Sequence, residues 1–155
     1  DLIVRKLNHL VAEGLDFDQV VDGITAYQAK TKLLFVLAKV DNLVKNGRLS
    51  KLVGTVVGLL NIRMVGEASK TGTLELLQKA RGQKKAIKAA FDELIKAGYN
   101  GGHITIAHRN NDKFIEQFSE LVREKFAQAS IEVLPTSGLC SFYAEEGGLL
   151  MGYEI

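Results

Sequence analysis

The chain has 155 residues, a length that fits one domain of ordinary size. Its apolar content of 46% and charged content of 25% are typical of a globular chain and exclude a disordered one. The 20 basic residues are nearly balanced by 18 acidic ones, which argues against a dedicated nucleic-acid surface.

The single cysteine, Cys140, excludes an internal disulfide and a cysteine-based metal site. No apolar run is long enough to cross a bilayer, and no signal peptide is visible. We therefore expect a cytoplasmic protein without a transmembrane segment. The sequence lacks an initiator Met, so we expect it to be a fragment of a longer protein.

Two amphipathic helices are predicted at the start of the chain. Apolar residues recur at helical spacing from Leu2 to Val11, and Gly14 is the expected stop. Either Asp16 or Asp18 is the expected N-cap of the second helix, whose apolar residues continue to Tyr27.

A buried strand, a short helical turn and an apolar helix are predicted next. The continuous apolar run Lys32–Val40 favours a buried strand. Asp41 is expected to cap one or two helical turns that end at Gly47. Ser50 then caps a predicted helix that continues to Asn61.

The rest of the sequence alternates strands and helices, which differ in the period of their apolar residues. The predicted elements are a hairpin over residues 61–68 and 71–80, a helix over 82–98, a strand over 101–109, a helix over 111–128, and strands over 130–137 and 147–155. About six strands with helices between them favour an α/β domain with a mixed sheet covered by helices.

The familiar motifs of catalysis and metal binding are absent. The chain has no P-loop, no nucleophile elbow and no zinc-binding histidine pair. His103 and His108 are five residues apart on one predicted strand, so they face opposite sides of the sheet. His108 is a weak candidate for a ligand contact, because it ends a strand of an open α/β sheet. Cys140 has no neighbouring base and is better explained as a small buried apolar residue.

The predicted helix from Leu49 to Asn61 is almost entirely apolar and contains Gly54 and Gly58. Each glycine costs a helix about 0.8–1 kcal/mol relative to alanine, so two of them indicate close packing. The packing partner is either another helix, as in an ordinary buried helix, or an extended ligand.

Positive charge gathers at the start of the predicted helix over residues 82–98. Arg81, Lys84, Lys85 and Lys88 lie where the helix dipole disfavours cations. Such a run is usually solvated, but the mismatch also indicates an anionic partner, such as a phosphate group or an acidic protein surface.

Several motifs, in this order, resemble the C-terminal domain of the DegV family. Residues 46–51 (NGRLSK) resemble the family's Gly-Gly-Arg-Ile-Ser-Lys, and residues 59–63 (LLNIR) resemble its Leu-Leu-Asn-Ile-Lys. Residues 81–86 (RGQKKA) are similar to its Arg-Gly-Arg-Lys-Lys-Ala, and residues 107–110 (AHRN) to its strand-end His-Ala-Asp/Asn segment. The resemblance covers essentially the whole chain.

The resemblance implies a two-layer α/β domain with a mixed six-stranded sheet. It also implies a fatty-acid-binding protein that holds a long acyl chain between two domains, and several members present the lipid to a bacterial fatty acid kinase. Residues 1–31 are then a helical connection from an N-terminal domain, and residues 32–155 form the C-terminal domain. The implied protein is not itself an enzyme and uses no cofactor or metal.

The resemblance also implies where the ligand and a partner bind. The predicted lipid-binding residues come from the apolar helix and its two ends: Arg48, Leu49, Leu52, Val53, Val56, Val57, Leu60 and Ile62. The predicted docking surface for a kinase partner is basic: Arg63, Arg81, Lys84 and Lys85. This surface also suits transient contact with an anionic membrane.

A departure from the family pattern leaves a second hypothesis open. The family's last loop carries a His that helps to hold the lipid carboxylate, whereas Ala144 stands at that position, followed by Glu145 and Glu146. Adjacent glutamates in a loop are usually only solvated, but near a ligand they would repel a carboxylate. The alternative is therefore a diverged structural or protein-interaction domain that has lost lipid binding.

Overall fold

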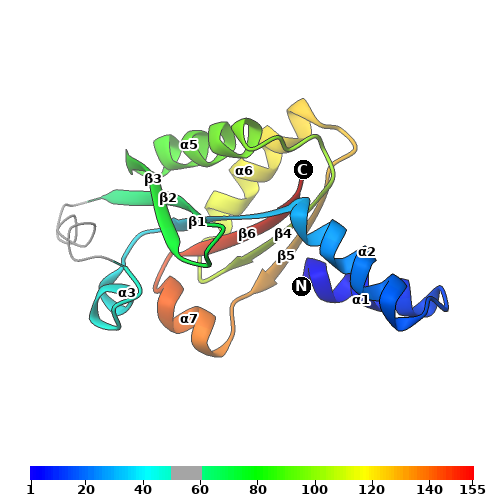
Figure 1. Ribbon diagram of the computed structural model, residues 1–155. Helices are drawn as coiled ribbons and strands as arrows, with labels where there is room; N and C mark the ends of the chain where they lie inside the picture. Colours follow the sequence, from blue (N-terminus) through cyan, green and yellow to red (C-terminus); the bar gives the residue numbers. More distant parts are fainter. Residues whose placement is uncertain (50–60) are drawn as a thin grey trace.

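The computed structural model describes residues 1–49 and 61–155 of the chain. Helices and strands alternate along most of these residues (Figure 1). In chain order the described elements are α1 (Leu2–Ala12), α2 (Phe17–Ala29), β1 (Thr31–Leu37), α3 (Asp41–Lys45), β2 (Ile62–Ala68), β3 (Leu74–Arg81), α5 (Gln83–Lys96), β4 (His103–His108), α6 (Asp112–Lys125), β5 (Ser130–Pro135), α7 (Gly138–Ala144) and β6 (Leu149–Glu154).

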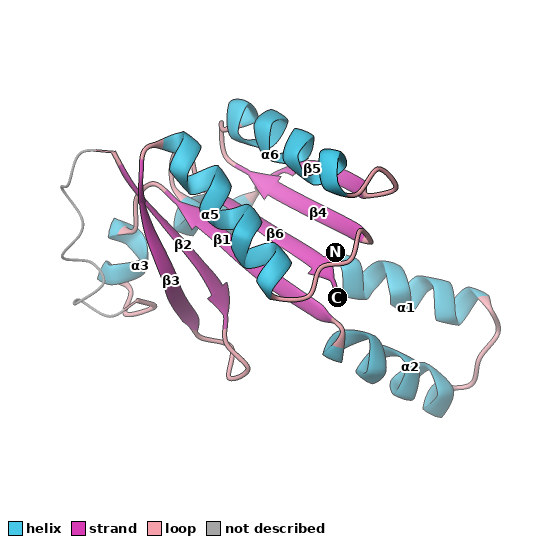
Figure 2. Cartoon of the chain, turned by 90° about the horizontal axis from the view of Figure 1, so that it is seen from above, coloured by secondary structure: helices cyan, strands magenta, loops and turns pink. Residues whose placement is uncertain are grey.

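The strands form one six-stranded sheet in the order β3-β2-β1-β6-β4-β5. β4 and β5 run parallel, and the other neighbouring strands run antiparallel. β6 therefore lies in the middle of the sheet and joins β1 to β4 (Figure 2). The predicted α/β class with a mixed six-stranded sheet is confirmed.

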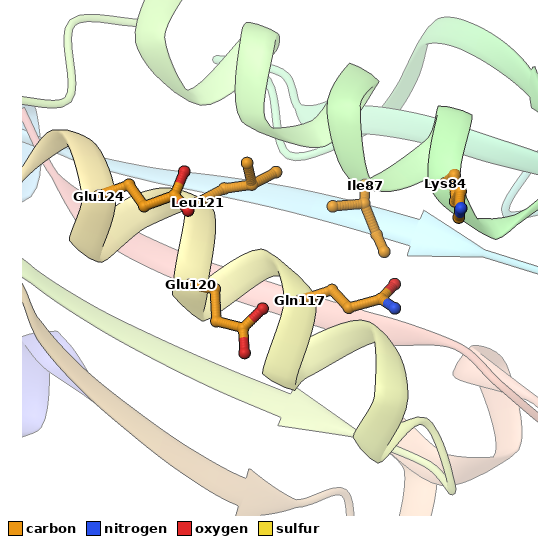
Figure 3. Close-up of a pocket in the computed structure, with 6 residues that line it drawn as sticks. All are labelled: Lys84, Ile87, Gln117, Glu120, Leu121 and Glu124. Atoms are coloured by element: carbon orange, nitrogen blue, oxygen red, sulfur yellow. The ribbon is translucent and has the colours of Figure 1, made fainter.

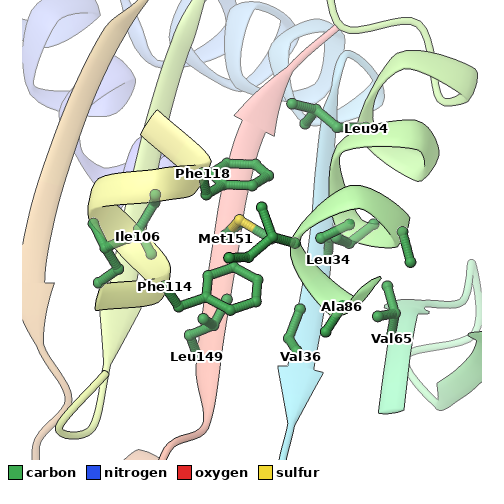
Figure 4. Close-up of a cluster of buried hydrophobic side chains, with 14 of the residues drawn as sticks. Leu34, Val36, Val65, Ala86, Leu94, Ile106, Phe114, Phe118, Leu149 and Met151 are labelled. Atoms are coloured by element: carbon green, nitrogen blue, oxygen red, sulfur yellow. The ribbon is translucent and has the colours of Figure 1, made fainter. Parts of the chain in front are cut away.

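α5 and α6 cover one face of the sheet, which we call the α5/α6 face. Apolar residues repeat at helical spacing on both helices, so each helix presents one stripe to the strands. The rings of Phe114 and Phe118 stack with their centroids 6.1 Å apart. Both rings lie beside Met151 in the middle of the sheet, and Leu94 of α5 belongs to the same buried cluster (Figure 4). This is the larger of the two buried apolar clusters among the described residues.

The opposite face, which we call the α3/α7 face, is covered by described elements at its two ends. α3 and α7 lie against one end, where Phe35, Leu43 and Met64 belong to a smaller buried cluster. α1 lies at the other end, where the side chain of Leu2 lies over Gly152 of β6.

α1 and α2 form a helical hairpin at the edge of the fold. Of the two expected caps, Asp16 begins α2: its carboxylate accepts the Gln19 N–H over 2.9 Å, and the Gln19 side chain accepts the Asp16 N–H over 3.0 Å. Tyr27 donates a hydrogen bond to Glu154 and so ties α2 to the sheet. The boundary predicted near residue 31 coincides with the end of this hairpin, and its role as a connection stays a prediction.

Two local expectations differ from the structure. β1 ends at Leu37 rather than Val40, because Val40 turns out of the extended conformation and becomes the N-cap of α3 in place of Asp41. No element is predicted between Pro135 and Gly147, yet α7 forms there after Ser137, which adopts an extended N-cap conformation. One face of α7 packs into the smaller cluster through Tyr143.

Candidate ligand-binding face

The α3/α7 face carries apolar residues that stay partly exposed. Side chains alternate along a strand, and Leu34 and Ile106 belong to the cluster on the α5/α6 face. Leu33, Ala107 and Leu150 therefore point to the opposite face, and all three are partly exposed. Figure 1 shows no described helix over this part of the sheet, between α7 and α1. The face presents an apolar surface that a lipid chain or another protein surface can cover.

α3 and α7 are joined at the edge of this surface by three contacts, which we call the α3–α7 clasp. The backbone N–H of Asn42 donates to the Glu145 carboxylate over 2.9 Å. The side-chain amide of Asn42 donates to the carbonyl of Phe142 over 2.8 Å. The guanidinium carbon of Arg48 lies 5.9 Å from the centre of the Tyr143 ring, which is within cation–π range.

The end of α3 determines where Arg48 lies. Gly47 has a φ of 67°, its N–H donates to Val44, and the Arg48 N–H donates to Leu43. These two bonds form a Schellman motif, which a glycine with positive φ normally completes. The Leu43 side chain is buried beneath the motif, so the backbone of Arg48 is attached to a packed helix end.

The loop from α7 to β6 is tight. Glu145 has φ 54° and ψ −174°, a conformation that costs a residue with a side chain about 1–3 kcal/mol. Two residues after Glu146, Gly148 approaches the carbonyl of Ala144 so closely that an added Cβ would lie 2.0 Å from its oxygen. The loop is therefore a constrained turn, and the side chain of its first residue, Glu145, points to α3.

The β4–α6 loop holds α7 from its other side. Nη1 of Arg109 donates to the Ser141 carbonyl over 3.0 Å. Nε of Arg109 lies 3.7 Å from the carboxylate of Glu146, which also accepts from Asn110 over 3.2 Å. The two adjacent glutamates thus have separate partners. The expectation that they are only solvated is wrong for Glu145, because its carboxylate binds the backbone of α3.

The predicted lipid-binding residues fall partly within the described chain. Arg48 is exposed, Leu49 is buried with the smaller cluster, and Ile62 begins β2. Five others lie outside the described residues: Leu52, Val53, Val56, Val57 and Leu60.

The four predicted docking residues lie at one end of the sheet but differ in exposure. Ile62 pairs with Arg81 at the end of β3, and Lys84 and Lys85 follow in the first turn of α5; all three basic residues are exposed. Lys84 also lines a groove of about 250 Å³ between α5 and α6, together with Glu120 and Glu124 (Figure 3). The surface around Lys84 therefore carries charges of both signs.

Arg63 differs from the other docking candidates because its side chain is partly buried. Its Nε and Nη1 atoms are buried and have no hydrogen-bond partner within the described part of the protein. Burial lowers the pKa of the Arg63 guanidinium. A cation in this position contributes less to an exposed docking surface than Arg81 does.

The histidines have structural partners. Nδ1 of His108 accepts the Asn111 N–H over 3.2 Å at the start of α6. His103 lies within 3.1 Å of the hydroxyls of Thr105 and Ser130, on the opposite side of β4. Residues 1–49 and 61–155 contain no group of three or more side chains suited to a metal ion.

Cys140 is exposed, so the expectation of a buried cysteine is wrong. The reason is α7, whose outer side carries Cys140 together with Leu139 and Phe142. Among the described helices, none is both long and apolar enough to span a membrane.

The mixed six-stranded sheet, with two helices over one face, defines a domain of the α/β class. The chain belongs to the DegV family: the family model described as "Uncharacterised protein, DegV family" matches residues 1–153. The predicted family resemblance is thereby confirmed.

Close relatives are longer than this chain. A DegV domain-containing protein of Streptococcus pneumoniae (strain R6) is 76% identical over 155 residues, which are all of this chain and 55% of that protein. A DegV domain-containing protein of Streptococcus pyogenes serotype M1 is 66% identical over the same length and is likewise covered to 55%. The chain thus spans about half the length of the curated relatives it matches.

Solved structures share the fold. The S. pneumoniae Fatty Acid Kinase (Fak) B3 protein loaded with linoleic acid matches with a TM-score of 0.97 and 75% identity, over 100% of this chain and 55% of that one. A DegV family protein from Eubacterium eligens loaded with heptadecanoic acid matches with a TM-score of 0.94 and 35% identity, over 99% of this chain and 55% of that one.

Proposed function

We propose that this chain forms one wall of a fatty-acid site and that the acyl chain lies on the α3/α7 face. The observation that carries the proposal is the 75% identity, over the whole chain, with a structure loaded with linoleic acid. Leu33, Ala107 and Leu150 offer the apolar surface, and removing a lipid chain from water contributes about 0.8 kcal/mol per CH2. The part of the relatives that this chain does not span supplies the opposite wall, so the lipid lies between two domains.

Arg48 is proposed to face the carboxylate of the lipid. It is exposed at the edge of the apolar surface, and its ring partner Tyr143 leaves the guanidinium donors available to an anion. The other predicted lipid-binding residues would lie along the acyl chain.

The longer protein is further proposed to present its lipid to a kinase partner. The support is that the S. pneumoniae relative is described as a Fatty Acid Kinase (Fak) B3 protein loaded with linoleic acid. Arg81, Lys84 and Lys85 would supply a basic docking surface, with an anionic membrane as its other partner. Arg81→Glu should abolish phosphorylation of the bound lipid and leave lipid affinity unchanged. Lys70→Glu, on an exposed side chain in the turn between β2 and β3, is the matched control and should affect neither.

The second candidate is a structural or protein-interaction domain without lipid. Ala144 favours it, because this residue is buried among apolar side chains and donates no side-chain hydrogen bond to a carboxylate. In that case the apolar surface would be covered permanently by the protein's other half.

One experiment separates the two candidates. The complete protein is purified from a bacterial host, its organic extract is analysed by mass spectrometry, and the stripped protein is titrated with linoleic acid. A near-stoichiometric fatty acid in the extract, with saturable rebinding, is the expected result. A clean extract and no rise in melting temperature with linoleic acid would favour the interaction domain.

A further inference from the structure

Glu145 combines an unfavourable backbone conformation with a specific side-chain contact. Its φ of 54° and ψ of −174° suit glycine better than glutamate. Its carboxylate nevertheless accepts the N–H of Asn42, a residue 103 positions away in the sequence. A residue held in this way indicates that the carboxylate, rather than the turn alone, has a role.

The contact replaces a missing helix cap. Val40 is the N-cap of α3 and has no side-chain acceptor, so α3 has no cap of its own. Asn42 is the second residue of this helix, the position whose N–H an N-cap side chain normally accepts. Glu145 supplies that acceptor from α7, and its negative charge suits the start of a helix.

The capped helix carries Arg48 at its other end. The Schellman motif at Gly47 attaches the backbone of Arg48 to Leu43, and the guanidinium of Arg48 returns to Tyr143 of α7. Tyr143 is two residues before Glu145. In the α3–α7 clasp, α7 therefore contacts α3 at both ends: Glu145 binds the start of α3, and Tyr143 packs against Arg48 just after its end.

We propose that Glu145 is a positioning residue for Arg48. By capping α3 from outside, it holds Arg48 over Tyr143, in the place where a fatty-acid carboxylate would meet the guanidinium. This inference rests on the proposed function for its ligand and on the clasp for its geometry. It also gives Glu145 a role that does not require contact with the anionic lipid.

The test uses the complete protein and linoleic acid as the probe. Glu145→Ala should raise the dissociation constant about tenfold, the effect of losing one charge-assisted hydrogen bond. The matched control is Glu146→Ala, which removes the same charge from the next residue but no contact with α3, and it should stay within about twofold of the wild type. Glu145→Gln keeps an acceptor oxygen and should recover most of the affinity.

A double-mutant cycle distinguishes positioning from a general loss of stability. If Glu145 acts through Arg48, the double variant Arg48→Ala/Glu145→Ala should bind no more weakly than Arg48→Ala alone. Additive losses would overturn the proposal. Glu145→Gly serves as a second variant, because it removes the carboxylate while suiting the turn; it should fold well and still bind weakly, and wild-type affinity in Glu145→Gly would also overturn the proposal.

Hydrogen exchange tests the clasp apart from the lipid. The Asn42 amide should exchange about tenfold faster in Glu145→Ala than in Glu146→Ala or the wild type. Unchanged exchange would overturn the role of Glu145 even if the protein binds linoleic acid. Faster exchange in a protein that takes up no fatty acid would support the clasp and refute the proposed function instead.

Discussion

The two faces of the sheet are built in different ways. On the α5/α6 face, two long helices bury a continuous apolar cluster in which Phe114 and Phe118 are almost fully enclosed. On the α3/α7 face, two short helices of 5 and 7 residues cover one end and are joined by polar contacts. Partly exposed apolar residues lie between them and α1.

This difference suggests that the α5/α6 face mainly sets the stability of the fold, whereas the α3/α7 face mainly serves ligand binding. A large buried cluster resists change because every side chain in it has many neighbours. A short helix held by a few hydrogen bonds is stable only marginally by itself, so its geometry depends on contacts such as the Asn42–Glu145 bond. Substitutions on the α5/α6 face should therefore change the free energy of unfolding, and substitutions on the α3/α7 face should change the affinity for the ligand.

The largest effect is expected at Phe118, which is 0% exposed on the α5/α6 face. Phe118→Ala should lower the free energy of unfolding by about 3–5 kcal/mol, because it leaves a cavity in the cluster. Urea unfolding measures the loss, and the linoleic acid affinity of the folded fraction should not change. A loss below about 1 kcal/mol would contradict the view that this face holds the fold together.

A smaller effect of opposite sign is expected at Arg63. Its enclosed, unpartnered Nε and Nη1 atoms within the described chain make the guanidinium costly to bury. Arg63→Met should raise the free energy of unfolding by about 1–3 kcal/mol. The exposed Arg81→Met is the matched control and should stay within about 0.5 kcal/mol of the wild type. Destabilisation by Arg63→Met would show that the guanidinium has a stabilising partner.

Two glycines allow a matched comparison of the site with a remote helix end. Gly47 and Gly14 have φ of 67° and 76°, and an added Cβ would meet nothing within 4 Å at either position. Alanine at either should therefore cost about 1–2 kcal/mol through the backbone alone. Only Gly47→Ala should also weaken linoleic acid binding, because it displaces Arg48. If both variants bind linoleic acid with equal affinity in a titration, α3 does not contribute to the site.

The smallest effect is expected from buried tyrosines, and it appears only when the pH is raised well above neutral. Burial raises the pKa of Tyr99 to about 12, and burial also raises the pKa of Tyr153 on the α5/α6 face. Both contribute full stability below pH 10, where unfolded tyrosine is still neutral, and this stability is lost as the pH rises from about 10 towards 12. Tyrosinate absorbance followed with the circular dichroism signal measures the loss. Ionisation of every tyrosine near pH 10 in the folded protein would contradict it.

The elements of the α5/α6 face could be predicted because their sequences are periodic. α6 repeats apolar residues at helical spacing through Phe114, Phe118 and Val122. α7 was not predicted, because its 7 residues span barely two turns and its neighbours are rich in glycine. The bond from Asn42 to Glu145 joins residues 103 positions apart, and no local pattern contains such a contact.

The position of β6 has a consequence for how the chain becomes ordered during synthesis. β1, β2 and β3 form one half of the sheet and β4 and β5 the other, and β6 joins them by pairing with β1 and β4. Until Leu149–Glu154 has left the ribosome, the nascent chain holds two half-sheets without a shared strand. The edges of β1 and β4 that pair with β6 stay unpaired during that interval and are open to chaperones. Completion of this sheet therefore waits for β6, which is made after the five other strands.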